Sequence, residues 1–233
     1  MSKTFQIGAG DKVKLYVALL PLGSRTEPID VEDITASAGI TANATTVTVD
    51  ALTGAIAGGT PLTFDNGTAK QVVYLATDAK VGETVLKIEP NLTALVGTST
   101  ANYIVKSRLL GGTQLNANIN ANRTNVLVFE DPLGYEDGAI TSQSWELPWT
   151  ANLLTDDEAY RRVSYAATQA VAGREVYIWQ QDPPPAGYAT GDGLKGACVV
   201  MNLQKNLQSN AICTVQMQFM GQGSPTITRY SLV

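Results

Sequence analysis

Residues 142–181 read SQSWELPWTANLLTDDEAYRRVSYAATQAVAGREVYIWQQ. Trp145, Leu147 and Trp149 alternate with polar residues, which is the period of a β-strand with one buried face. A helical segment follows, and residues 175–181 return to the β-branched and aromatic composition of a strand. Because strand patterns also fill most of the remaining chain, this order predicts a mainly β fold, a β-sandwich or barrel with one flanking α-helix.

The helical segment has a start signal and a stop signal. Thr155 and Glu158 have the spacing of a capping box, so Thr155 is the expected N-cap. Gly173 is expected to end the helix, because glycine readily adopts the left-handed conformation of a C-terminal cap. The stripe expected to face the sheet consists of small side chains that permit close packing: Ala159, Val163, Ala166, Ala167, Ala170 and Val171.

Alternating patterns elsewhere predict further strands at residues 12–20, 126–129, 142–149, 197–207 and 211–220. The last two are expected to form a hairpin through Ser209-Asn210, and the acidic loop 130–138 is expected to join 126–129 to 142–149. Residues 113–122 have two apolar residues at a helical spacing of four, but their asparagine content opposes a helix. We expect an extended loop or a ragged strand there.

An internal duplication occupies residues 36–107. The sequences TVTVDALT at 46–53 and VLKIEPNLT at 85–93 each lead into a small apolar turn with glycine, at a spacing of about 40 residues. We therefore expect a small inserted all-β domain with two similar halves at 36–107. The core domain would then consist of residues 1–35 and 108–233.

The composition argues against several classes of function. The chain has no histidine, which removes Ser–His–Asp and Cys–His chemistry. Its net charge of −5, without any basic run, argues against specific nucleic-acid binding. No apolar segment is long enough to span a bilayer, so no membrane partner is expected. Cys198 and Cys213 each lie in an apolar strand pattern and are expected to be reduced and buried rather than bonded.

Two groups of residues could carry chemistry, and each has a simpler structural explanation. Asp131, Glu136 and Asp137 could surround a calcium ion, but an acidic hairpin tip is the commoner explanation of such a group. Trp145 and Trp149 could stack on a sugar, but tryptophans on an alternating apolar face usually belong to a core. We expect no catalytic residue, no bound metal and no cofactor, and therefore no enzyme.

The last predicted long strand leads into residues 219–226, FMGQGSPT. Together with the order of hairpin, helix, strand, long loop and hairpin over residues 124–229, and with the opening strand 12–20, this phrase resembles the major tail tube proteins of tailed bacteriophages. In that family the last long strand commonly leads into a phrase like F-x-G-x-G-x-P-T. The segment 36–107 departs from the minimal subunit of the family.

The resemblance implies a structural virion protein, made in the host cytoplasm and located in the tail. Hexameric rings would close the sheets of neighbouring copies, removing their exposed edges, and stacked rings would form a conduit for phage DNA. The implied partners are other copies of the chain, the tape-measure protein and DNA inside the lumen, and the tail terminator and distal tail proteins. An insert outside the tube would clash with a sheath, which favours a non-contractile tail.

Within that arrangement, contacts between subunits and rings are expected from the arms 1–11 and 221–233 and from the loop 182–195. The residues expected to make them are Phe5, Ile7, Tyr188, Asp192, Phe219, Pro225, Arg229 and Tyr230. A second set of uncharged polar side chains on the last hairpin is expected to line the lumen without binding phosphate: Asn202, Gln204, Thr214, Gln216 and Gln218.

Two alternatives remain open from the sequence. The chain could be another virion structural protein, such as a tail terminator, a head–tail connector or a capsid decoration protein. It could instead be a carbohydrate-binding adhesin that uses Trp145, Trp149 and the insert. Rings or tubes of uniform bore would favour the tail tube, and binding to a glycan would favour the adhesin.

Overall fold

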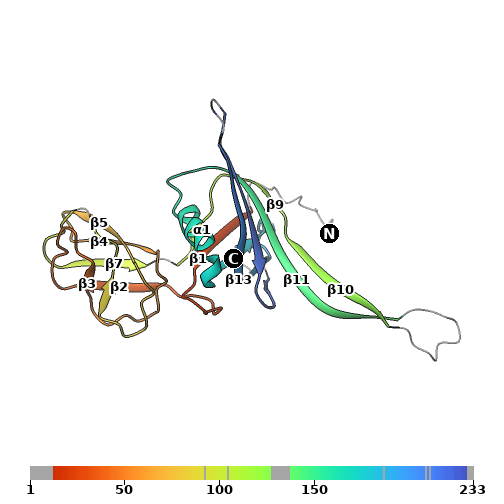
Figure 1. Ribbon diagram of the computed structural model, residues 1–233, viewed down its shortest axis with the longest axis horizontal. Helices are drawn as coiled ribbons and strands as arrows, with labels where there is room; N and C mark the ends of the chain where they lie inside the picture. The colour runs from red at the N-terminus through yellow and green to blue at the C-terminus, as the bar shows by residue number, and fades with distance from the viewer. Residues whose placement is uncertain are drawn as a thin grey trace.

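The computed structural model describes residues 13–91, 93–103, 105–126, 137–185, 187–207, 209 and 211–229. Figure 1 shows two bodies side by side, and a long two-stranded ribbon that leaves the larger body on the side away from the smaller one. The described residues are mainly β-strand, with antiparallel pairing and one α-helix, which confirms the predicted fold class.

The larger body contains a nine-stranded sheet, counted over the described residues. Its strands are β1 (Lys14–Leu19), β8 (Ser107–Arg108), β9 (Gly112–Leu115), β10 (Asn118–Val126), β11 (Asp137–Asn152), β12 (Val176–Gln181), β13 (Gly193–Asn206), β14 (Thr214–Gly221) and β15 (Thr226–Thr228). They follow the order β10-β11-β14-β13-β12-β1-β8, while β9 pairs with β11 and β15 pairs with β13. The sheet therefore connects the first strand of the chain with the last.

One face of this sheet packs against helix α1 (Glu158–Thr168). Trp145, Leu147 and Trp149 of β11 are buried there, as their alternation predicted. Neighbouring strands add more apolar residues to the same core, among them Val17, Ile178, Cys198, Val200, Val215, Met217 and Phe219. The helix presents Ala159, Val163 and Ala166 to them, so small side chains set the close distance between helix and sheet.

The start of α1 differs from the prediction. The N-cap is Asp157, whose Oδ1 accepts a hydrogen bond from Ala159 N at 2.9 Å. Its other carboxylate oxygen accepts from Leu110 N at 3.0 Å, so the cap also fixes the chain after β8. Glu158 accepts from Arg162 and from Ser107. The predicted cap at Thr155 is therefore wrong, because Asp157 meets both a helix N–H and a distant strand.

The end of the helix carries a short extension. A 3₁₀ turn at Ala170–Ala172 follows α1 and ends at Gly173, which has φ 82°. Glycine tolerates this left-handed conformation without strain. The stop predicted at Gly173 is thus correct for the helical segment, although α1 itself ends at Thr168.

The asparagine-rich segment forms regular strands. Both β9 and β10 lie where an extended loop or ragged strand was expected, and β10 begins at Asn118. It pairs with β11 over its whole length, with one irregularity after Asn122. The expected strand 126–129 has only residue 126 within the described range. Pairing with β11 overrides the low strand propensity of asparagine.

The smaller body is inserted between β1 and β8. One sheet has the order β2-β7-β4-β5, and β3 pairs with β6 beside it. The bounds are β2 (Val31–Ala36), β3 (Thr46–Thr48), β4 (Pro61–Asp65), β5 (Lys70–Tyr74), β6 (Val85–Lys87) and β7 (Ser99–Tyr103). Val47 lies opposite Leu86, so the two sequences that show the duplication pair with each other. The pairing of β2 with β7 begins at Val31, so the smaller body starts five residues before the expected segment 36–107.

A carboxylate joins the two bodies. Asp78 of the smaller body accepts hydrogen bonds from Gly58 N at 2.7 Å and from Leu22 N at 2.8 Å. Buried Arg174 of the larger body donates to Asp78 at 2.7 Å and to Leu20 O at 2.9 Å. Burial opposes ionisation of Asp78, but the two backbone N–H groups and the Arg174 charge outweigh it and lower its pKa.

Backbone contact reinforces this joint. Gly59 has φ 82°, and a Cβ at that position would come within 2.5 Å of the Tyr165 ring of α1. Only glycine satisfies both the left-handed backbone and this approach. The smaller body is thus held by its chain crossings, by Asp78 and by direct packing on the helix.

Candidate assembly surface

Over strands β11, β13 and β14, the face of the sheet opposite α1 is lined mainly by uncharged polar side chains. Their strand partners follow from the register: Gln204 lies opposite Gln216, which lies opposite Thr150. The next row pairs Asn202 with Gln218. All five residues predicted to line a lumen project from this one face of β13 and β14, and each is exposed or half-buried.

The same face continues onto the ribbon formed by β10 and β11. Asn118, Asn120 and Asn122 lie opposite Glu146, Ser144 and Ser142. Together with the hairpin residues they form what we call the polar face: Gln114, Asn118, Asn120, Asn122, Ser142, Ser144, Glu146, Thr150, Asn202, Gln204, Thr214, Gln216 and Gln218. Sequence reasoning missed its ribbon half, although asparagine at every second position from 118 to 122 carried the signal.

The polar face holds one charged residue, Glu146. Its carboxylate accepts from Gln218 Nε2 at 2.9 Å and from Asn118 Nδ2 at 3.2 Å, which links β10, β11 and β14. Amide and hydroxyl groups can both donate and accept hydrogen bonds, but firm binding to a nucleic-acid backbone requires clustered Lys and Arg. The polar face as defined here contains no Lys or Arg that could hold a nucleic-acid backbone.

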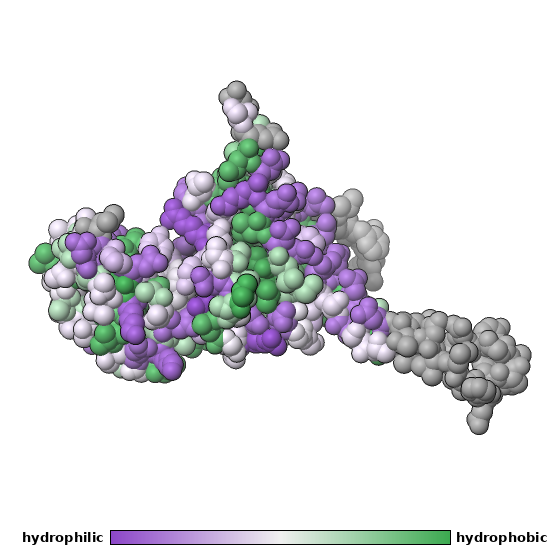
Figure 2. Space-filling view, in the orientation of Figure 1, coloured by the Kyte–Doolittle hydropathy of each residue, from purple (hydrophilic) through white to green (hydrophobic). Residues whose placement is uncertain are grey.

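Apolar side chains interrupt and flank the polar face. On the β13–β14 hairpin, Leu207 is 66% exposed and Ile212 is 74% exposed, and Met201 and Met220 are also exposed, as is Ile227 of β15. Figure 2 shows apolar colour gathered along this hairpin, with polar colour beside it. The hairpin rises beyond the helix in Figure 1, so no described residues form a second layer over its upper part. These exposed apolar residues form what we call the apolar strip, and such a surface is typical of a contact surface.

The β10–β11 ribbon is the second surface without cover. It extends away from both bodies in Figure 1, and its residues Ile119 and Ile140 are 56% and 63% exposed. In the described part of the chain, β10 has no strand on its outer edge. Isolated two-stranded ribbons are marginally stable in water, and open edges invite pairing with another chain. Among the described residues, the outer edge of the ribbon and the side chains of Ile119 and Ile140 are therefore left uncovered.

The predicted contact residues fall into three groups. Phe5, Ile7 and Tyr230 lie outside the described residues. Tyr188, Asp192 and Pro225 are half-buried, and Arg229 is exposed and donates to Asp192 at 3.4 Å. Phe219 is fully buried in the core beneath α1, which corrects its assignment as a contact residue. It faces inward because the alternation of β14 places Phe219 on the same face of the strand as Met217 and on the opposite face from Gln218.

The tryptophans expected of an adhesin are not available to a sugar. Trp145 and Trp149 both belong to the buried core, and Trp145 Nε1 donates to Gly223 O at 2.8 Å. A stacking platform requires an exposed ring face. The structure therefore removes the feature on which the adhesin alternative depended.

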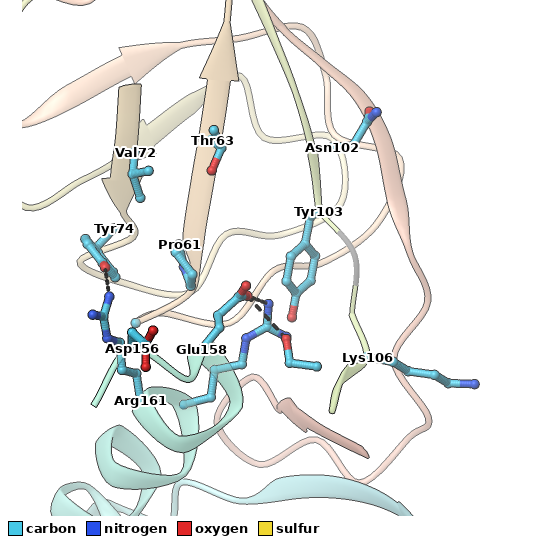
Figure 3. Close-up of a pocket in the computed structure, with 13 residues that line it drawn as sticks. Pro61, Thr63, Val72, Tyr74, Asn102, Tyr103, Lys106, Asp156, Glu158 and Arg161 are labelled. Atoms are coloured by element: carbon cyan, nitrogen blue, oxygen red, sulfur yellow. Dashed lines mark hydrogen bonds and ion pairs between the residues drawn. The ribbon is translucent and has the colours of Figure 1, made fainter. Parts of the chain in front are cut away.

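A cleft of about 500 Å³ lies between the start of α1 and the smaller body (Figure 3). Arg161 donates to the Tyr74 hydroxyl at 3.3 Å, and the Arg162 guanidinium lies 5.4 Å from the centre of the Tyr103 ring. Burial raises the pKa of Tyr103. Arg162 also donates to Val105 O at 2.6 Å. These groups pair with one another across the joint, so the cleft is a seam between the two bodies.

Three further properties concern the described residues. No cluster of three or more histidine, cysteine, aspartate or glutamate side chains is arranged there to hold a metal. No helix among them has the length and apolar character needed to cross a membrane. Cys198 and Cys213 are both free thiols, and burial raises the pKa of Cys198. Cys213 is half-buried and precedes β14, so its predicted burial in a strand is wrong.

The chain was compared with known proteins. No protein-family model matches it, and no curated protein matches it. A chain from the tail of an empty gene transfer agent particle is similar at 13% identity and a TM-score of 0.43, over 54% of this chain and 87% of that chain. A chain from the virion of a native gene transfer agent particle is similar at 14% identity and a TM-score of 0.42, over 53% and 88%. Similarity of this size assigns no function.

Proposed function

We propose that this chain is a structural protein of a phage-like virion and that it forms the tail tube. The observation that carries the proposal is a sheet whose polar face extends from the β13–β14 hairpin onto a projecting ribbon. Such a surface is too wide and too uncovered for a solitary subunit. Neighbouring copies would extend it into a continuous wall.

The chemistry of the polar face fits a conduit. Its uncharged side chains are hydrated and lack the cations that would hold phosphate. Copies joined head to tail close into a ring when their rotation divides the circle, and stacked rings make a tube. Hexameric rings are the state that the sequence resemblance implies. The smaller body projects from the opposite side to the ribbon, so it would stand clear of the wall (Figure 1).

The partners in this proposal follow from the same geometry. Other copies would cover the ribbon and the apolar strip, while DNA and a tape-measure protein would pass the polar face. Terminator and distal tail proteins would meet the two ends of the tube. An array of outward bodies leaves no room for a sheath, so the tail would be non-contractile.

Electron microscopy of the purified full-length chain tests the proposal. We expect annular particles or tubes of uniform bore at high protein concentration, with sixfold averages when viewed along the axis. Closed discs that never stack would instead favour a terminator or connector. Dispersed monomers at every concentration, in the presence and absence of molecular crowding agents, would refute the assignment.

A further inference from the structure

The cleft between α1 and the smaller body contains polar groups that the pairs across the joint leave unused. Asp156 and Thr63 line the cleft and are exposed, and their side chains form no hydrogen bond or ion pair with any described residue. Asn102 is bonded through its Oδ1, which accepts from Asp33 N at 2.8 Å, so its amide nitrogen remains available. The lining therefore offers a carboxylate, a hydroxyl and an amide nitrogen to a ligand.

One wall of the cleft is the outer face of β4 and β5. Pro61 of β4 lies opposite Tyr74 of β5, and Thr63 lies opposite Val72 in the next row. All four line the cleft, while Leu62 between them points into the core. The wall thus places two rings and an apolar side chain beside a hydroxyl, and small-molecule pockets combine apolar surface with a few polar groups in this way.

The facing wall is the start of α1, and its charges select the kind of ligand. Arg161 donates to the Tyr74 hydroxyl at 3.3 Å and keeps further N–H groups, since a guanidinium has about five. A phosphate group would meet the carboxylates of Asp156 and Glu158, and a cation would meet Arg161 and Arg162. A neutral ligand with several hydroxyl groups can donate to the carboxylate and accept from the guanidinium.

The Tyr103 hydroxyl is an independent sign of such a ligand. Tyr103 is 2% exposed, and Figure 3 shows its ring pointing into the cleft toward the side chains at the start of α1. Its hydroxyl forms no hydrogen bond with any described residue, and the buried Thr60 hydroxyl beside it has none either. Buried polar atoms are nearly always hydrogen-bonded. A ligand hydroxyl at the inner end of the cleft can donate and accept, so it would satisfy this group.

We propose that the cleft binds one pyranose unit of a neutral glycan. A pyranose has an apolar C–H face and a rim of hydroxyl groups. The C–H face matches the rings of Pro61 and Tyr74, and the rim matches Asp156 and Arg161. The Tyr103 hydroxyl takes a ligand hydroxyl at the inner end. The volume of about 500 Å³ lies within the range of small-molecule pockets.

Both walls of the cleft belong to one copy of the chain. The inference therefore goes beyond the proposed tail tube and does not rest on it. It also concerns a different surface from Trp145 and Trp149, which are buried in the core of the larger body. Binding measured on a monomer can fail while tubes form, and tubes can fail to form while the cleft binds its ligand.

Saturation-transfer difference NMR on the full-length chain tests the inference. The probes are neutral methyl glycosides of the common hexoses and N-acetylhexosamines, with inorganic phosphate as the anionic comparison. We expect at least one glycoside to bind with a Kd of about 1 mM or below, and equimolar phosphate should not displace it. No saturation transfer to any glycoside would overturn the inference. Displacement by phosphate would also overturn it, because the cleft would then be an anion site.

The Asp156→Asn variant locates the binding in the cleft. It should weaken binding of the glycoside at least about tenfold, because the amide cannot accept from two hydroxyl groups as a carboxylate does. The matched control is Asp50→Asn, an exposed carboxylate of the smaller body outside the cleft, which should bind like the parent chain. Equal affinity in the two variants would overturn the inference.

The Tyr103→Phe variant separates a ligand contact from a structural role. Because the hydroxyl has no partner among the described residues, its removal should not lower the Tm. The affinity for the glycoside should nevertheless fall at least about threefold, since one hydrogen bond to the ligand is lost. Unchanged affinity, or a lower Tm, would overturn the inference.

Discussion

The smaller body and the β10–β11 ribbon are both built from antiparallel strands, but only the body encloses a core. Leu62, Phe64 and Leu86 are fully buried between its two sheets. The ribbon exposes Ile119 and Ile140 and has no second layer of described residues. Alternation along a strand therefore shows which of its faces is apolar. Whether that face is buried within the same subunit depends on the rest of the chain.

The largest expected effect comes from removing the core of the smaller body. Phe64→Ala should cost about 3–5 kcal/mol of its unfolding free energy, because a fully buried aromatic ring leaves a cavity. Hydrogen exchange of residues 31–103 measures this directly. Val81→Ala, at an exposed position of the same body, is the control and should change the free energy by less than about 0.5 kcal/mol. Similar losses in both variants would contradict a closed core.

The ribbon should respond in the opposite way. Ile119→Ser/Ile140→Ser should leave the stability of the monomer within about 0.5 kcal/mol, since both side chains are exposed. Burial of each in an assembly would contribute about 1.5–3 kcal/mol, so the concentration needed for assembly should rise at least about a hundredfold. Analytical ultracentrifugation measures both states. Assembly at the unchanged concentration would show that the ribbon is not part of the contact.

A smaller effect is expected at the joint of the two bodies. Asp78→Asn should cost about 2 kcal/mol, because hydrogen bonds to the charged carboxylate become bonds to a neutral amide. Limited proteolysis of the segment 21–30 reports on opening of the joint. The matched control is Asp50→Asn, an exposed carboxylate of the same body. No change in cleavage by Asp78→Asn would contradict the role of this carboxylate.

The same joint should depend on pH with a defined sign. The pKa of Asp78 is lowered from its ordinary value of 3.8, so its contribution is fully present above that pH. The contribution is lost as the pH falls through the lower pKa of the folded state. The difference in unfolding free energy between the parent chain and Asp78→Asn should therefore shrink below pH 3.8 in urea titrations. A difference that stays constant from neutral pH into this range would contradict the assignment.

The smallest effect separates two possible helix caps. Asp157→Ala should cost about 1 kcal/mol, because Asp157 accepts from Ala159 N and from Leu110 N. Thr155→Ala should cost much less, since Thr155 is not the N-cap. Thermal unfolding followed by circular dichroism compares the two. The reverse order of losses would restore the capping box predicted from sequence.

Local patterns predicted the local structure well. The alternation of Trp145, Leu147 and Trp149 identified a buried strand face, and Ala159, Val163 and Ala166 of the small-residue stripe lie on the packed side of α1. The prediction is wrong for Val171, which is exposed on the 3₁₀ turn after α1. The uncharged outward face of the last hairpin was also evident from Gln216 and Gln218. These features depend on neighbours within a few residues, so periodicity contains them.

Features that depend on distant residues could not be predicted in this way. Asp157 is the cap partly because Leu110, far away in sequence, donates to it. Asparagines 118, 120 and 122 lie in a strand because β11 pairs with them, against their own propensity. Phe219 is inward because of the layer formed with α1, which the phrase that follows it does not reveal. Tertiary partners settled each of these positions.

The pairing of β1 with β12 sets an order for folding during synthesis. Lys14 lies opposite Gln181, so until most of the chain has left the ribosome the first strand has only the two-residue strand β8 as a neighbour in the sheet. At about 5–20 residues per second, that wait lasts roughly ten seconds or more. The smaller body, complete once Tyr103 has emerged, can fold in the meantime and hold the early chain in a compact form. The insert would then act as an early folding unit that shelters the N-terminal strand while it waits for its partner.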